Sequence, residues 1–191
     1  IDTNIINKIV NLGSIKNEDI VLEIGPGTGN LSEKILLKKP KKLTLVEKDK
    51  NLSEILRKKF GEKIHLVNKD FLNLSETFFL DKNMIAFGNL PYNVSTQILA
   101  KIIKIKDLEQ KFKILIFMFQ KEVADRIVAK KDSKNYGRLS ILANWRLNIK
   151  KIMNVGPKSF SPSPKIESTV LFFEPKKNYF KFDNVNNLEK I

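Results

Sequence analysis

The feature that most constrains the fold is a regular alternation of short apolar runs with amphipathic stretches. Between the runs, apolar side chains recur with helical spacing, as at Leu52, Ile55, Leu56 and Phe60. Strands that alternate with helices form a mostly parallel sheet with right-handed crossovers. The runs that predict these strands cover residues 20–24, 43–46, 64–67, 84–87 and 112–119.

The last third of the chain departs from this pattern. Segments 149–155 and 169–173 predict an antiparallel pair of strands. The predicted fold class is therefore α/β, with a doubly wound, mostly parallel sheet of seven strands. Ligands bind such sheets beyond the carboxyl ends of the strands, so the residues that follow each strand are the most informative ones.

Composition excludes several classes of function. Cysteine is absent and His65 is the one histidine, so thiolate metal sites and Ser-His-Asp hydrolysis are excluded, and we expect no metal. No apolar run approaches the ~20 residues of a membrane span and no signal-peptide pattern opens the chain, which predicts a cytoplasmic protein without a membrane partner. The net charge of +14 favours a polyanionic partner. Only four of the 35 basic residues are arginine, however, and such a lysine bias is what an AT-rich genome produces in any protein.

A glycine-rich turn follows the first predicted strand. Gly25 and Gly27 belong to a Gly-x-Gly-x-Gly sequence, which differs from both the dinucleotide fingerprint and the P-loop. The second strand ends at Glu47, 22 residues beyond Gly25, where an acid is the expected partner of a ribose hydroxyl pair. Gly25, Gly27 and Glu47 are therefore predicted to bind a cofactor, and we include Glu23, which precedes the turn, and Lys48, which follows Glu47, among the predicted cofactor-binding residues.

The third predicted strand is followed by Asp70 and Phe71. An aspartate can accept a hydrogen bond from an adenine amine, and an adjacent aromatic or apolar group can pack on the adenine ring. Together with Gly25, Gly27 and Glu47, this pair predicts an adenosine-binding site.

The most specific local signal is Asn89-Leu90-Pro91-Tyr92, at the end of the fourth strand. Pro91 biases Leu90 toward an extended backbone, so the segment can present carbonyl oxygens and the Asn89 amide oxygen to one planar amine. Tyr92 can stack on a flat base. We interpret these four residues as catalytic, with Asn89 also facing the cofactor.

These motifs resemble those of S-adenosylmethionine-dependent adenine methyltransferases, and three further stretches narrow the resemblance to the ribosomal RNA small-subunit adenine dimethyltransferase family. The resemblance runs from residue 1 to about 174 and implies a Rossmann-like methyltransferase domain, 1–174. It also implies that 175–191 begin a small helical RNA-binding domain that is mostly missing, and that a short element that precedes Ile1 in the family is missing too. The three stretches are 120–126, 136–140 and 160–168.

The resemblance implies that S-adenosylmethionine dimethylates the exocyclic amine of two adjacent adenosines near the 3′ end of 16S rRNA, in ribosome assembly. The implied partner is small-subunit rRNA in a pre-30S particle, with the enzyme a monomer. The target base must leave its stack, and Tyr92 with Phe160 can hold it between two rings. Arg138 and Lys165 are candidate phosphate contacts.

Three alternatives stay open at this point. A large-subunit adenine methylase of the macrolide-resistance type shares the fold and the Asn-Pro-Tyr chemistry. A DNA adenine methylase is disfavoured because that family typically carries aspartate where Asn89 stands. A non-catalytic ribosome-assembly or RNA-binding factor would retain its function after Asn89→Ala, whereas an enzyme would lose turnover.

Overall fold

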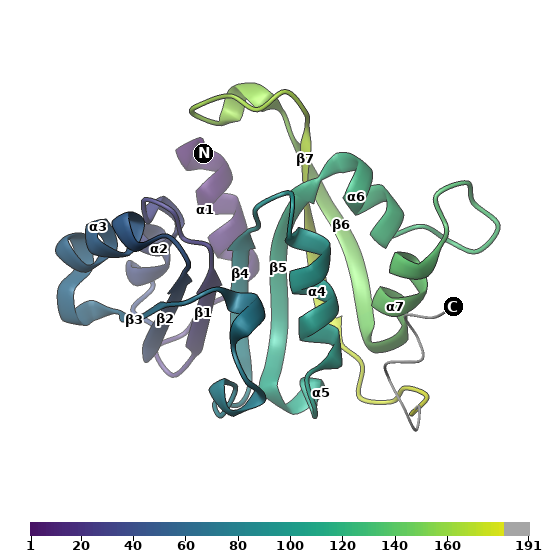
Figure 1. The fold of residues 1–191 in the computed structure, drawn as a ribbon, viewed down its shortest axis with the longest axis horizontal. Helices are drawn as coiled ribbons and strands as arrows, with labels where there is room; N and C mark the ends of the chain where they lie inside the picture. Colours follow the sequence, from purple (N-terminus) through teal and green to yellow (C-terminus); the bar gives the residue numbers. More distant parts are fainter. Residues whose placement is uncertain (182–191) are drawn as a thin grey trace.

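In the computed structural model, residues 1–181 are described, and they form one sheet of seven strands with helices on both faces (Figure 1). The strand order is β3-β2-β1-β4-β5-β7-β6. Strands β1 to β5 run parallel, and β7 lies antiparallel between β5 and β6, so the predicted fold class is confirmed. The strands are β1 (Ile20–Ile24), β2 (Lys42–Glu47), β3 (His65–Asn68), β4 (Met84–Asn89), β5 (Phe112–Gln120), β6 (Leu147–Val155) and β7 (Ser168–Pro175).

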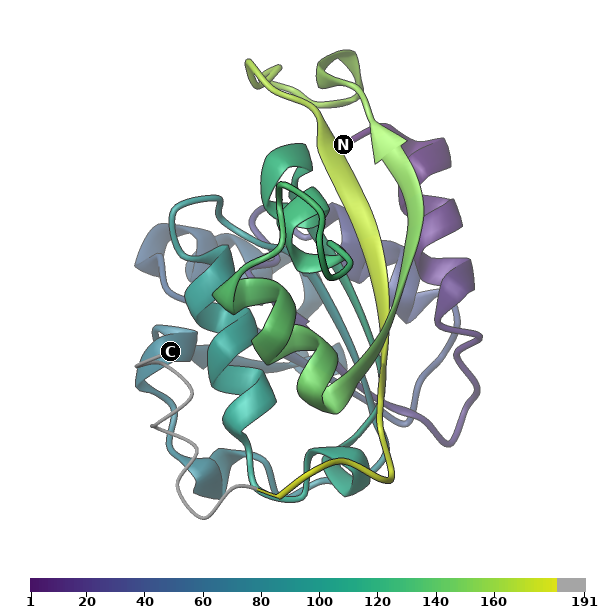
Figure 2. The ribbon, with the colours of Figure 1, turned by 90° about the vertical axis from the view of Figure 1, so that its right-hand side faces the viewer.

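The helices divide between the two faces because successive strand residues point to opposite sides. Val21 packs with α1, α2 and α3 on one face, whereas the next residue, Leu22, packs with α4 to α7 on the other. Figure 2 shows α1 on one side of the long β6–β7 pair and α4, α6 and α7 on the other. The helices are α1 (Thr3–Leu12), α2 (Asn30–Leu36), α3 (Lys50–Phe60), α4 (Ser95–Lys104), α5 (Leu108–Lys111), α6 (Lys121–Ile127) and α7 (Arg138–Arg146), with 3₁₀ turns at Gly61–Lys63, Phe71–Asn73, Glu76–Phe78 and Pro157–Ser159.

Helix α1 is an element that the strand-and-helix pattern did not predict. Asp2 caps it, since its Oδ1 accepts hydrogen bonds from the backbone N–H groups of Asn4 at 2.8 Å and Ile5 at 3.2 Å. The helix buries Ile6 and Ile9 against the sheet. An aspartate followed by isoleucines at helical spacing is the signal that could have found it.

Strand positions agree with the prediction to within one or two residues. The third strand begins at His65, one residue later than expected, and it lies at an edge of the sheet with the imidazole exposed. Trp145 of α7 is half-buried and packs against the core cluster that contains Leu22.

The junction between the glycine-rich turn and α2 needs a residue without a side chain. Gly29 has φ +81°, and a Cβ at this position would lie 2.6 Å from Cε2 of Phe60 and 2.8 Å from Cδ2 of Leu56. Helix α3 therefore packs directly against the start of α2, and this contact fixes the far end of the turn.

A buried arginine ties α7 to α4. Arg146 is 4% exposed, and its Nη1 donates to the carbonyl oxygens of Ile103 at 2.8 Å and Ile105 at 2.7 Å. Its Nη2 donates to Glu109 Oε2 at 3.0 Å. These bonds satisfy carbonyl groups at the C-terminal end of α4.

Residues 176–181 follow β7 without forming a helix or strand, and the backbone N–H of Lys176 donates to the Arg146 carbonyl at 2.8 Å. Most of the expected start of a C-terminal domain, 175–191, lies outside the described residues. None of the helices in the part of the chain that the structure describes is long and apolar enough to cross a membrane.

Candidate active site

The parallel register brings the carboxyl ends of β1 to β4 to one edge of the sheet. Ile24 lies between Val46 of β2 and Gly88 of β4, so the glycine-rich turn begins between the ends of both neighbours. A pocket of about 190 Å³ opens at this edge. Six of the predicted site residues line it, namely Gly25, Glu47, Lys48, Asp70, Phe71 and Pro91, whereas Gly27, Asn89, Leu90 and Tyr92 are not part of the lining.

Glu47 is tied to the glycine-rich turn. Its carboxylate is 7% exposed, and Oε2 accepts a hydrogen bond from the N–H of Gly27 at 3.2 Å. Oε1 accepts from the N–H of Asp49 at 2.9 Å. A Cβ added to Gly27 would meet nothing within 4 Å, so the turn borders open space where a ligand can approach the backbone.

Asp70 and Lys48 form an ion pair at the other end of the pocket. Lys48 Nζ lies 2.9 Å from Asp70 Oδ2, and the N–H of Leu72 donates to Oδ1 at 2.9 Å. The hydrogen bond from Lys48, followed by that from Leu72, holds the pKa of Asp70 below its ordinary value. The carboxylate is therefore an ionised acceptor at neutral pH. Phe71 is 4% exposed and packs edge-on against Phe79, which makes it a rigid wall of the pocket.

The Asn89–Tyr92 segment passes close to the glycine-rich turn. A Cβ at Gly25, whose φ is +67°, would lie 3.9 Å from the Asn89 carbonyl oxygen and 3.7 Å from Cδ of Pro91. The side chain of Leu90 is 1% exposed and packs in the core, so this residue can offer only its backbone to a substrate. Tyr92 is half-buried, and its hydroxyl lies 2.8 Å from Ser168 Oγ.

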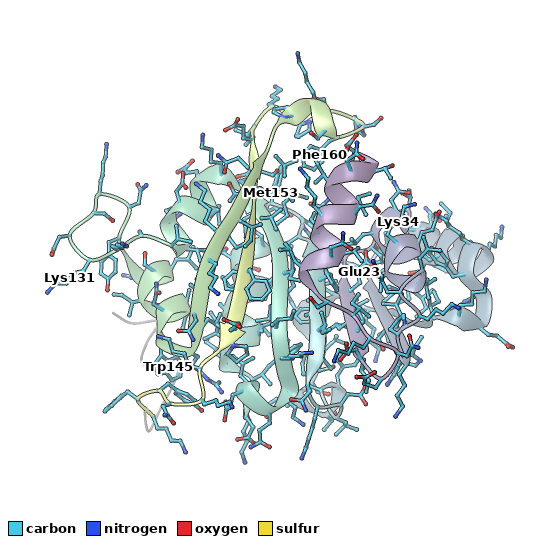
Figure 3. The ribbon with its side chains drawn as sticks, turned by 180° about the vertical axis from the view of Figure 1, so that it is seen from behind. Glu23, Lys34, Lys131, Trp145, Met153 and Phe160 are labelled. Carbon is cyan, nitrogen blue, oxygen red and sulfur yellow. The ribbon has the colours of Figure 1, made fainter. Side chains whose placement is uncertain are left out.

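Glu23 lies outside the lining of this pocket. Its side chain is 1% exposed on the α2 side of the sheet, as Figure 3 shows, and Ser32 Oγ of α2 donates to Oε2 at 2.6 Å. Burial raises its pKa from 4.5 to about 7, against the effect of the Ser32 hydrogen bond, and the charge of Glu47 adds to the rise. Its contact is with the helix behind the turn.

Phe160, Arg138 and Lys165 also lie away from the pocket lining. Phe160 is half-buried in the loop before β7, where it packs against the hydrophobic cluster that includes α1 (Figure 3). Arg138 begins α7 and is exposed, as is Lys165 in the Phe160 loop. Among residues 1–181, no group of three or more histidine, cysteine, aspartate or glutamate side chains is arranged to hold a metal ion.

The structure also joins the three stretches that carry the family resemblance, which the sequence analysis treated separately. Lys121 Nζ pairs with Glu167 Oε2 at 2.7 Å, and this contact links stretches 120–126 and 160–168. Ser140 Oγ donates to the Arg126 carbonyl at 2.6 Å, which links 136–140 to 120–126. No local pattern predicts such contacts, because each partner lies on a different element.

A parallel sheet with a glycine-rich turn after β1, acids after β2 and β3, and Asn-Leu-Pro-Tyr after β4 defines a Rossmann-like methyltransferase. A family model described as ribosomal RNA adenine dimethylase matches residues 1–191. The chain belongs to this family, and the predictions of family and enzyme class are confirmed.

Relatives and solved structures agree with this assignment. The chain is 52% identical over 191 residues to ribosomal RNA small subunit methyltransferase A of Pelagibacter ubique, covering 100% of this chain and 72% of the relative. It is 42% identical to the protein of that name from Malacoplasma penetrans, covering 99% and 67%.

A dimethyladenosine transferase from Plasmodium falciparum superposes with a TM-score of 0.80 at 33% identity, over 91% of this chain and 62% of that one. The 23S rRNA methyltransferase ErmE has the same TM-score of 0.80 at 21% identity, over 100% and 74%. The likeness to ErmE shows a shared fold alone.

Proposed function

We propose that this chain transfers methyl groups from S-adenosylmethionine to the exocyclic amines of two adjacent adenosines near the 3′ end of 16S rRNA, in a pre-30S particle. The observation that carries the proposal is a pocket lined by Gly25 of the glycine-rich turn, the acids Glu47 and Asp70, and Pro91, with the Asn89 carbonyl passing close to Gly25. Family membership supports rRNA adenine as the acceptor.

The residues at the pocket fit an adenosine moiety. Glu47 keeps both carboxylate oxygens fixed by backbone N–H groups, and each oxygen has a lone pair left for a ribose hydroxyl. Asp70, ionised, can accept from the adenine amine once Lys48 shares or leaves Oδ2. Phe71 and Pro91 border the space between these acids. S-adenosylmethionine supplies an electrophilic methyl group on its sulfonium.

The acceptor amine is a weak nucleophile, because its lone pair is delocalised into the adenine ring. The Asn89 amide oxygen and the carbonyl of Leu90 or Pro91 accept its two hydrogens and favour a pyramidal, nucleophilic nitrogen. The nitrogen then attacks in line: an N–C bond forms, the S–C bond breaks, and its electron pair stays on sulfur. The added positive charge on nitrogen is removed when a proton leaves to solvent. In this proposal most of the acceleration comes from positioning.

The remaining residues act on the RNA. The base leaves its stack and is held by Tyr92, and the Phe160 loop forms the opposite wall of the base site when RNA binds. The exposed cations Arg138 and Lys165 contact phosphates. The enzyme acts as a monomer in the cytoplasm.

The test uses full-length protein with undermethylated small-subunit and, separately, large-subunit particles. Mass spectrometry of nuclease digests counts methyl groups on adenosine after incubation with S-adenosylmethionine. We expect dimethyladenosine in small-subunit RNA only, and none with Asn89→Ala. Methylation of large-subunit RNA would point to the resistance type of enzyme. Donor binding without methylation of either particle would point to a non-catalytic assembly factor.

A further inference from the structure

The hydroxyl of Tyr92 forms a hydrogen bond with a buried strand residue, Ser168. Ser168 Oγ, 2.8 Å away, belongs to the first residue of β7 and is 0% exposed. The backbone of Ser168 is paired with Gln120 of β5 on one side and Val155 of β6 on the other. Tyr92, by contrast, lies in the turn between β4 and α4. The hydrogen bond therefore connects a loop residue to an interior strand that is 76 residues away in the sequence.

Tyr92 is held at a second point as well. Ser95 Oγ, at the start of α4, donates to the Tyr92 carbonyl at 3.2 Å. This bond fixes the backbone, but the ring can still turn about its two side-chain torsions. The hydroxyl bond to Ser168 restrains the first torsion because it fixes the far end of the ring. It restrains the second because a phenolic hydroxyl forms its hydrogen bonds preferentially in the plane of its ring.

The position of Ser168 is itself secured by its neighbour. Glu167 accepts a hydrogen bond from Lys121 Nζ at 2.7 Å, and its carbonyl accepts from the Lys121 N–H at 2.9 Å. The loop that carries Phe160 therefore ends at a point bonded to both the start of α6 and Tyr92.

We propose that Ser168 is a positioning residue that sets the plane of the Tyr92 ring for stacking on the target adenine. This inference rests on the proposed role of Tyr92. A ring free to turn would hold the base in more orientations, so fewer of the bound complexes would place its amine in line with the methyl group. Ser168 does not line the donor pocket, so donor affinity should not change.

The test compares Ser168→Ala, Tyr92→Phe and the double variant, each in the full-length protein. Thr169→Val is the matched control: Thr169 is also 0% exposed and loses a hydroxyl bonded at 2.9 Å, but to Asn154 and on the opposite face of β7. Turnover is measured on undermethylated small-subunit particles at saturating S-adenosylmethionine, and donor affinity by calorimetry.

Each single variant should lower kcat about tenfold, the contribution of one neutral hydrogen bond, with unchanged donor affinity. The double variant should be no slower than either single one, because both remove the same bond. Thr169→Val should stay within about twofold of the wild type.

Wild-type turnover in Ser168→Ala, losses that multiply in the double variant, or an equal loss in Thr169→Val would overturn the inference. If Ser168→Ala does not fold, Tyr92→Phe carries the test, since wild-type turnover there has the same meaning. Tyr92→Ala distinguishes the stacking role of Tyr92 from the positioning role of Ser168. Full activity of Tyr92→Ala would refute the stacking role itself, whereas its inactivity beside a fully active Ser168→Ala would refute only the positioning.

Discussion

Replacing Glu23 by glutamine should stabilise the protein, and the gain should grow with pH. In the folded chain the carboxyl group is buried against Ser32 and near Glu47, which raises its pKa from 4.5 to about 7. Between these two values the unfolded chain releases this proton and the folded chain keeps it. The free energy of unfolding therefore falls as pH rises through this interval.

The size of the effect follows from the pKa difference. Each pKa unit corresponds to ~1.4 kcal/mol, so a rise from 4.5 to about 7 costs about 3 kcal/mol once both states are ionised. At pH 5 most of this cost is absent, and at pH 8 nearly all of it is present. Glutamine stays neutral, and its carbonyl can still accept from Ser32. The Glu23→Gln variant should therefore gain ~2–3 kcal/mol relative to the wild type between pH 5 and pH 8.

Urea denaturation of both proteins at pH 5, 6, 7 and 8 measures this directly. The pH dependence of the difference is the informative quantity, because any misfit of the glutamine amide is the same at every pH. Glu33→Gln is the control. Glu33 is exposed on α2, next to Ser32, and its hydrogen bond to Lys59 lowers its pKa, so its effect on stability is expected below pH 5. A Glu23→Gln difference that stays constant to within ~0.5 kcal/mol from pH 5 to pH 8 would refute the reasoning.

Three further variants test separate parts of the structure. Gly29→Ala should lower the free energy of unfolding by ~2–4 kcal/mol, because φ is +81° and the new Cβ would lie 2.6 Å from an aromatic carbon of Phe60 in α3. Gly27→Ala, where φ is +59° and no atom lies within 4 Å of the new Cβ, should lower it by only ~1 kcal/mol. Equal losses in urea titrations of the two variants would contradict the packing argument. Arg146→Met should cost ~2–4 kcal/mol in the same assay, because it leaves Glu109 and two buried carbonyls without their donor; a neutral result would mean that water replaces the guanidinium. Asp70→Asn should weaken S-adenosylmethionine binding ~10-fold or more by calorimetry, and unchanged affinity would remove Asp70 from the proposed donor site.

Much of the candidate site could be predicted because its chemistry is carried by residues that directly follow strands. The positions of Glu47, Asp70 and Asn89 relative to one another depend only on parallel strands being adjacent, and apolar runs with helical crossovers predict that. What the pattern could not distinguish was the direction of a side chain at a strand's end. Glu23 precedes the turn by two residues, but alternation along β1 places it on the α2 side of the sheet, behind the pocket.

The contacts that hold the site together were beyond sequence reasoning for a different reason. Ser168 can reach Tyr92 only because β7 inserts antiparallel between β5 and β6, which puts its first residue beside the carboxyl end of β5. An apolar run predicts a strand but not its neighbours, so segments 149–155 and 169–173 could be paired with each other without revealing which of them adjoins β5. Arg146 shows the same limit, since its partners are backbone carbonyls at the end of α4, which no residue type marks. Side chains that contact a ligand must be of a suitable chemical type and therefore leave a signal in the sequence. Side chains that only position such groups need no special chemical type, only the correct place in the fold. The sequence therefore does not distinguish Ser168 or Arg146 from other serines and arginines.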